Sequence, residues 1–523
     1  MKKKLLALLL ATAMVATLFA GCGGNEEPDN SENKGSEVVG DTDESESEEE
    51  QEEPDEIVIA LMCTAPMDQS ITDHVEEAIN EMLLEKVNVK ADIMWFQAAD
   101  YGQKVPMMLQ GGEQIDLMMM TPVPSASYAS FLTAGQLMDI APYLDEYGQG
   151  IKEAMGDYLG ATSVGDATYA VGNLASLYGF LAINMRADVL RDLGLYEQAA
   201  AIKSWDDYEA ILEEVVAKTD YAGVSNSDAE GTIITCQPFM VGTGAFADAY
   251  WVDTIGDGYQ YTYVDAETNT VKCYFENPAF MSAVKEMGEW NKKGLIYEDA
   301  HTTDEYGAAL IKSGVSFSYL AAGELGGAAT VASNAGCEIL QIEVTPRLVG
   351  TAAFQKFGFC VPVTSDYPEA AIKVLNLLFT DKEVVDTFTW GVKGVDWVEK
   401  DGLATYPEGA DAQSVYHTGD FLYGNVLNIT PWEGNAADIR EQQAEANKNA
   451  AASKYIGCAL DTSTVATEIA AVKDIVDRYK EGLCSGVTDY EAEYQKFIDA
   501  IYAAGMQDII NEFQAQLDAW LAN

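Results

Sequence analysis

Between Ile57 and Met120, short apolar runs alternate regularly with amphipathic stretches, and this pattern limits the possible folds. Short apolar or alternating runs predict strands, and apolar residues at a spacing of three or four predict helices. The predicted elements are strands over 57–62, 87–95 and 116–120 and helices over 75–83 and 101–110. This order implies a parallel sheet with helices on its faces, in which ligands bind beyond the carboxyl ends of the strands.

The alternation continues through the rest of the chain, which ends in helices. Further helices are predicted over 188–193, 205–218, 277–291 and 366–379, and further strands near 315–320 and 357–363. We expect Asp366 to cap its helix, with Glu369 reaching back to it. After residue 465, three apolar stripes at helical spacing predict terminal helices that pack in a core, and Gly505 separates the last two.

The N-terminus has the pattern of an export signal. Lys2, Lys3 and Lys4 precede an apolar run that ends at Ala20 and is too short for a membrane span of roughly 20 residues. The order Phe19-Ala20-Gly21-Cys22 resembles the lipobox of bacterial lipoproteins, with Phe19 in place of the usual leucine. We therefore predict a lipoprotein signal peptide over 1–21 and lipidation of Cys22; an ordinary secretory signal that releases a free protein is the alternative.

The segment that follows is acidic and of low complexity. Residues 25–56 contain 16 acidic side chains and one lysine, and the chain from residue 57 onward keeps a net charge of -43 of the total -55. Like charges that repel one another prevent collapse, so residues 22–56 are predicted to be a disordered tether, with an acidic recognition tail as the alternative. The acidic balance argues against nucleic acid and against electrostatic docking on anionic lipid.

The body from residue 57 is long enough for two or three hydrophobic cores and has no second apolar run of membrane-spanning length. Seven cysteines follow Cys22 without any CxxC pair, so neither a zinc site nor a disulfide framework is indicated, although Cys458 and Cys484 remain a possible pair.

Enzyme signatures are missing from the sequence. The three histidines are scattered, and no GxSxG, HExxH or P-loop pattern occurs. The run Asp253–Gly258 does not fit the spacing of an EF-hand loop. We predict no catalytic residue, no metal and no cofactor, while a glycosidase pair among the many carboxylates stays open.

Several segments carry a family resemblance in their order and spacing. They are Gly111–Leu117, Gly135–Ile140, Ile183–Leu190, Ser204–Tyr208 and Tyr367–Ala371, together with Trp390–Trp397, Tyr423–Asn425, Ala503–Gly505 and Gln516–Trp520. The chain resembles the extracellular solute-binding proteins of carbohydrate ABC transporters, in a lipoprotein-like subgroup with an extra helical C-terminal region. It departs from the subgroup pattern at Lys393, Asp396 and Trp397.

The resemblance implies a two-lobed periplasmic-binding-protein-like α/β fold with a hinge, each lobe a mixed or parallel sheet flanked by helices, and a helical C-terminus. We expect residues 57–172 with 358–395 in the first lobe, and 173–357 with 396–523 in the second. It further implies a monomer that is anchored at the outer face of the cell membrane, traps its ligand by closure of the lobes and delivers it to ABC permease subunits.

A sugar offers an apolar face and a rim of hydroxyls, so its site needs aromatic rings and polar groups. Trp205, Trp290 and Trp520 are assigned to helix packing instead. The candidate ligand-binding residues are Trp95, Tyr178, Trp251, Trp390, Trp397, Asn425 and Trp432. The predicted function is a non-enzymatic receptor for an oligosaccharide. The alternatives are a peptide or sugar-acid receptor, which Lys393 would suit, and a surface glycosidase or adhesion module.

Overall fold

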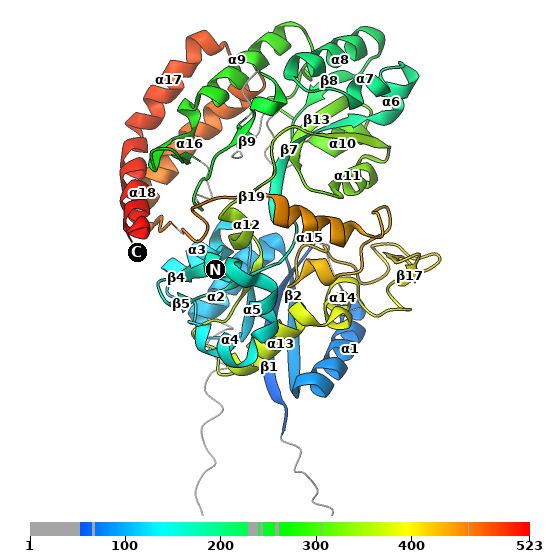
Figure 1. Ribbon diagram of the computed structural model, residues 1–523, viewed down its shortest axis with the longest axis vertical. Coiled ribbons are helices and arrows are strands. Elements are labelled where there is room, and N and C mark those ends of the chain that lie inside the picture. The colour runs from blue at the N-terminus through cyan, green and yellow to red at the C-terminus, as the bar shows by residue number, and fades with distance from the viewer. Residues whose placement is uncertain are drawn as a thin grey trace, which may run out of the picture. The chain divides into compact units, whose positions relative to one another are not determined.

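The computed structural model describes residues 53–64, 68–227, 239–240, 244–256, 261–303, 305–458 and 460–522. Cys22, the predicted signal peptide and most of the predicted tether lie outside the described residues, as do Cys236 and Asp257. Figure 1 shows an α/β fold in which helices flank two main sheets.

The first sheet follows the alternation predicted at the start of the body. Its strands in spatial order are β2 (Val89–Gln97), β1 (Asp55–Cys63), β3 (Leu117–Met120), β16 (Gly358–Cys360) and β6 (Val171–Gly172). The strands β1, β2 and β3 are parallel, as predicted, whereas β16 runs antiparallel to β3 and β6. The sheet is therefore mixed, and its parallel part ends at Cys63, Gln97 and Met120.

The second sheet is built around one long central strand. Its strands are β19 (Ala451–Ala452), β15 (Leu348–Val349), β7 (Tyr178–Arg186), β13 (Ser316–Gly323) and β8 (Ala222–Ser225), with β14 (Ile339–Glu343) also paired to β7. Both β13 and β14 run antiparallel to β7, and β13 is parallel to β8. The short strand pairs outside both sheets are β4 (Ser163–Val164) with β5 (Ala167–Thr168), β9 (Phe239–Met240) with β10 (Tyr250–Trp251), β11 (Thr262–Asp265) with β12 (Thr270–Cys273), and β17 (Val398–Lys400) with β18 (Leu403–Thr405).

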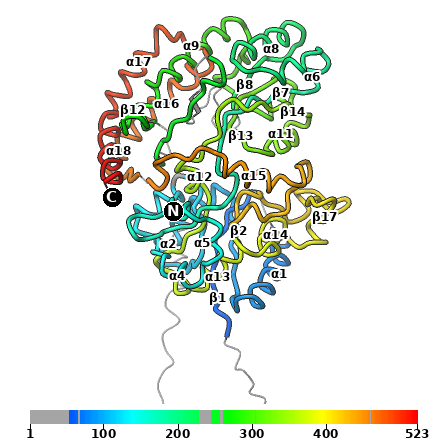
Figure 2. Tube along the Cα trace, in the orientation of Figure 1, coloured from blue at the N-terminus to red at the C-terminus, as the bar shows by residue number. Residues whose placement is uncertain are grey.

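Helices connect the strands and close the chain. Up to β8 they are α1 (Gln69–Val87), α2 (Ala98–Gly111), α3 (Tyr128–Thr133), α4 (Ala141–Tyr147), α5 (Gln149–Met155), α6 (Ala187–Asp192), α7 (Tyr196–Ala200) and α8 (Trp205–Lys218). Those that follow are α9 (Pro278–Lys292), α10 (Gly307–Lys312), α11 (Gly327–Ala335), α12 (Ala352–Gln355), α13 (Pro368–Thr380), α14 (Lys382–Trp390), α15 (Ile439–Asn449), α16 (Ala466–Cys484), α17 (Tyr490–Ala503) and α18 (Met506–Leu521). Figure 2 shows α13 beside α4 and α5.

The apolar stripes predicted after residue 465 are confirmed as core packing. Residues such as Val472, Phe497 and Phe513 are almost fully buried, and they share one hydrophobic cluster with β11, β12 and α9. Gly505 separates α17 from α18 at a φ of 111°, which only glycine adopts without strain. The terminal helices are therefore part of a packed body.

Two predictions are wrong. Asp366 does not cap α13, because the residue at the N-cap is Tyr367, no side chain caps the helix, and Pro368 at its first position needs no N–H partner. Glu369 instead accepts a hydrogen bond from the Tyr147 hydroxyl at 3.1 Å. Cys458 and Cys484 form no disulfide with each other in the described part of the chain, and both side chains are buried.

Within the described part of the chain, none of the helices combines the length and the apolar character that crossing a bilayer would require.

Candidate functional site

The carboxyl end of β1 holds an exposed aromatic ring in place. Tyr423 donates a hydrogen bond from its hydroxyl to the carbonyl of Met62 at 2.9 Å, and Asn173 donates to the carbonyl of Phe421 at 3.0 Å. These bonds fix the segment around Phe421 beside the end of β1, where an α/β sheet places its ligands. The Phe421 ring is 40% exposed and lies 5.2 Å from the Phe357 ring, centroid to centroid.

A charged group lies directly next to this ring. Arg440, on α15, donates to the Asp420 carboxylate at 2.5 Å, to the Gln443 side chain at 3.0 Å and to the carbonyl of Ile429 at 3.2 Å. The guanidinium is buried and its donors are directed to fixed partners. Arg440 thus holds Asp420 in position and has little capacity left for a ligand.

Glu324 follows β13 and joins the second sheet to this cluster. The next residue, Leu325, accepts a hydrogen bond from Gln443 at 3.0 Å, which fixes the loop against α15. The Glu324 side chain is exposed to solvent, yet the surrounding protein desolvates the carboxyl and raises its pKa; the charge of Asp420 raises the pKa further, while Lys356 and Arg440 oppose it. Among the described residues, no hydrogen bond or ion pair engages the carboxylate.

An exposed carboxylate that is desolvated and unpaired has unused hydrogen-bonding capacity. Together with an exposed aromatic ring it provides the two kinds of contact that a sugar needs, acceptors for hydroxyls and an apolar plate. We define the candidate site by six residues: Glu324, Lys356, Phe357, Asp420, Phe421 and Arg440.

The residues predicted from sequence fall into two other groups. In the first, Trp390 is 2% exposed and donates from its indole to the carbonyl of Thr430 at 2.9 Å, and Trp397 is 3% exposed and donates to the carbonyl of Gly391 at 3.0 Å. The partly exposed Trp432 packs on Trp390 with ring centroids 4.8 Å apart.

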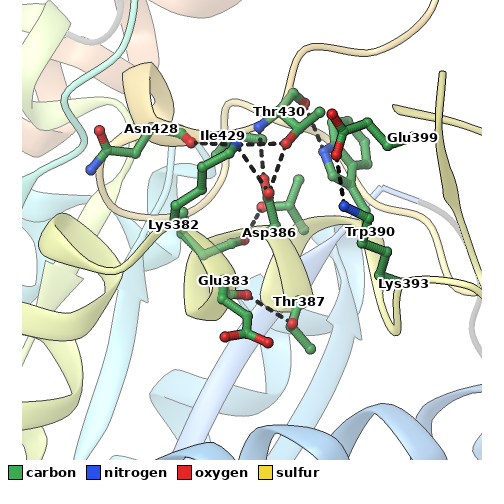
Figure 3. Close-up of polar contacts among 12 residues, drawn as sticks. Lys382, Glu383, Asp386, Thr387, Trp390, Lys393, Glu399, Asn428, Ile429 and Thr430 are labelled. Atoms are coloured by element: carbon green, nitrogen blue, oxygen red, sulfur yellow. Dashed lines mark hydrogen bonds and ion pairs between the residues drawn. The ribbon is translucent and has the colours of Figure 1, made fainter. Parts of the chain in front are cut away.

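Figure 3 shows why Trp390 is held so firmly. Asp386 accepts two hydrogen bonds from Thr430, each of 2.7 Å, and forms an ion pair of 3.1 Å with Lys382. The Thr430 carbonyl that receives the Trp390 indole is therefore fixed from the side of α14. In the same view, Lys393 pairs with Glu399 at 2.6 Å.

In the second group, Tyr178 and Trp251 lie near the end of β15. Tyr178 pairs with Val349 in the sheet and is 2% exposed, and the Trp251 ring lies against the backbone of Gly350, where a Cβ atom would overlap it. Burial raises the pKa of Tyr178. Trp251 stays partly exposed.

The remaining two predicted residues hydrogen-bond to different segments. Trp95 is partly buried on β2, and its indole donates to the Tyr416 hydroxyl at 3.3 Å. Asn425 is 8% exposed and donates to the carbonyl of Phe379 at 3.2 Å. Contact of these seven residues with the ligand stays a prediction.

Sequence reasoning missed Glu324 and Phe421, although each had a usable signal. Glu324 lies four residues after the strand predicted near 315–320, and strand ends are where ligands bind in such folds. Phe421 lies two residues before the segment Tyr423–Asn425 that carried the resemblance. The predicted set of five tryptophans, Tyr178 and Asn425 included neither of them.

Known proteins similar to this chain share its fold. Residues 81–394 match a family model described as bacterial extracellular solute-binding protein, and residues 454–522 match one described as a domain of unknown function, DUF3502. A carbohydrate ABC transporter substrate-binding protein of Streptococcus pneumoniae serotype 4 is 21% identical over 86% of this chain and 89% of its own length.

Two solved structures extend this similarity. The crystal structure of the N-glycan transport solute binding protein NgtS from Streptococcus pneumoniae has a TM-score of 0.76 and 20% identity, covering 90% of this chain and 99% of its own. The same protein in complex with Man5GlcNAc has a TM-score of 0.65 and 20% identity, with the same coverage. The likeness confirms the predicted fold class.

Proposed function

Because the chain belongs to the family of bacterial extracellular solute-binding proteins, we propose that it is the receptor of a carbohydrate importer of the ABC class. It binds an oligosaccharide, performs no chemistry on it and delivers it to the membrane permease. The similar proteins support this proposal, since one is called a carbohydrate ABC transporter substrate-binding protein and another was crystallised with Man5GlcNAc.

The observation that carries the proposal is the unpaired carboxylate of Glu324 together with the exposed ring of Phe421. Glu324 follows a strand of the second sheet, whereas Phe421 is anchored to the end of a strand of the first. A ligand that contacts both residues would bridge the two sheets and stabilise one relative placement of them.

We propose two lobes, each built on one main sheet, with the connections 173–177 and 350–357 as part of the hinge. The predicted lobe boundary at residue 396 moves in this proposal. Tyr416 donates to the carbonyl of Phe388 on α14 at 2.7 Å and Tyr423 donates to the carbonyl of Met62 on β1 at 2.9 Å, so we assign residues 396–446 to the first lobe. The C-terminal helices stay with the second.

We also propose that Cys22 carries the lipid anchor and that the acidic segment tethers the receptor at the outer face of the membrane. The signal pattern of residues 1–21 supports export.

Isothermal titration calorimetry of the purified protein tests the proposed function. The ligands are Man5GlcNAc, a maltooligosaccharide, a fructan oligosaccharide and, as a control, a peptide of similar size. Saturable binding of at least one glycan, with recovery of the unchanged glycan afterwards, is the expected result. Absence of binding to every glycan tested, or release of shorter products, contradicts the proposal.

A further inference from the structure

The formal charges of the candidate site cancel. When ionised, Glu324 and Asp420 are negative and Lys356 and Arg440 are positive, so the site holds two acidic and two basic side chains. The charge of Arg440 is already directed at Asp420, because the two form an ion pair of 2.5 Å and the Arg440 side chain is only 10% exposed. What remains for a ligand is the free carboxylate of Glu324 and the exposed ammonium of Lys356.

No other arginine from residue 53 onward has a guanidinium available to bind a ligand carboxylate. Every lysine and arginine from residue 53 onward is among the described residues. Of the five arginines, four are in ion pairs with carboxylates, and Arg478 donates to the carbonyl of Asp474 in its own helix. Bidentate binding by arginine is the usual way to hold a carboxylate.

Lys393, which suggested an anionic ligand at the sequence level, is also engaged. Its ammonium pairs with Glu399 at 2.6 Å and lies 5.2 Å from the centre of the Trp397 ring. Lys356 is therefore the cation of the candidate site that has no ion pair among the described residues, and its nearest aromatic contact is the Phe357 ring at 5.8 Å.

Resting on the proposed function, we propose that the ligand is an uncharged oligosaccharide and that Glu324 makes the site discriminate against glycans that carry a carboxylate. A sugar hydroxyl can donate a hydrogen bond to the Glu324 carboxylate, whereas a uronate brings a second negative charge to it. The net charge of -43 from residue 57 onward adds a repulsive field for any anionic glycan.

The test uses matched ligands that differ by one charge. Each neutral glycan, Man5GlcNAc, the maltooligosaccharide and the fructan, is compared with its derivative oxidised to a carboxylate at a terminal C6, and with the methyl ester of that derivative. Calorimetry at low and high salt gives the Kd of each. At low salt, we expect the acid to bind roughly tenfold or more weakly than the neutral glycan, and the methyl ester to regain the affinity of the neutral glycan. High salt should reduce the difference in Kd between the acid and the neutral glycan, because it screens the charges.

Two variants of the site should change the difference in Kd between the acid and its ester in opposite directions. Glu324→Gln should narrow the gap between acid and ester, because it removes the repelling carboxylate, and Lys356→Gln should widen it, because it removes the free ammonium. Equal or tighter binding of the acid, or a gap that neither variant moves, overturns the inference and leaves the proposed function standing. If no glycan binds in its neutral, acid or ester form, both the proposed function and this inference are wrong.

Discussion

At the residue scale, burial decides what an aromatic side chain can do. Trp390 and Trp397 are fixed by hydrogen bonds from their indoles to backbone carbonyls, whereas Phe421 keeps 40% of its surface exposed. The sequence shows which residues are aromatic but not which are exposed, because exposure depends on contacts between distant segments such as Tyr423 and Met62. For this reason the candidate site was less predictable than the strands and helices.

Phe421→Ala should weaken glycan binding roughly 5- to 30-fold, as expected for the loss of about 1–2 kcal/mol of apolar contact with the sugar ring. Tyr367→Ala is the matched control. Tyr367 is 37% exposed and follows Ser365, which bonds to Asp116 just before β3, at the opposite end of the parallel strands. Calorimetry should show normal affinity for the control; equal losses in both variants would remove Phe421 from the site.

His417 should make stability depend on pH. It packs between Trp390 and Trp432, and burial lowers its pKa to about 4. The unfolded chain takes up a proton near pH 6.5 and the folded protein does not until about pH 4, so stability falls as the pH drops through this window. At pH 5 the cost relative to pH 7 is about 2 kcal/mol.

The variant His417→Phe keeps an aromatic ring and removes the titration. Denaturant unfolding at pH 7 and pH 5 should show a smaller loss of stability in the variant than in the parent protein. The same loss in both proteins would mean that His417 is not responsible for it.

At the scale of elements, the local sequence pattern was sufficient to predict a helix where that helix has one clear apolar face. The prediction over 205–218 coincides with α8, and Ser204 caps that helix by accepting from the backbone N–H of Asp207. The cap predicted at Asp366 failed because Pro368 changes which residue begins the helix. The antiparallel pairing of β16 with β3 was also not predictable from local pattern, because the two strands are more than 200 residues apart in the sequence.

Gly486 follows α16 at a point where the chain touches α9. It has a φ of 69°, and a Cβ atom there would fall on the carbonyl oxygen of Met287. Gly394 has a φ of 89° and open space around it, so it is a matched control for backbone strain alone. We expect Gly394→Ala to cost about 1 kcal/mol and Gly486→Ala at least about 2 kcal/mol more, measured by chemical unfolding. Equal costs would contradict the close packing of α16 on α9.

At the scale of the whole molecule, the proposed account joins an anchor, a tether and a ligand-binding body. Family membership rests on residues 81–394, and the terminal helices extend the same packed body. The sequence indicated this organisation through the order of its segments, while the contacts that place Glu324 and Phe421 depend on the folded chain.

Cys22→Ser should release the receptor from the membrane without changing its affinity for glycans, because the anchor lies far along the chain from the candidate site. Fractionation of cells should show the variant lost from the membrane, and calorimetry should give the parent Kd. Retention at the membrane would contradict lipidation of Cys22.

We propose that a bound glycan bridges the two lobes and closes them. Small-angle X-ray scattering of the purified protein, with and without a saturating glycan identified by calorimetry, tests this most directly. We expect a smaller radius of gyration in the bound state, and a smaller decrease in Glu324→Gln at the same glycan concentration. An unchanged scattering profile at full saturation would contradict closure and identify a rigid glycan-binding module instead.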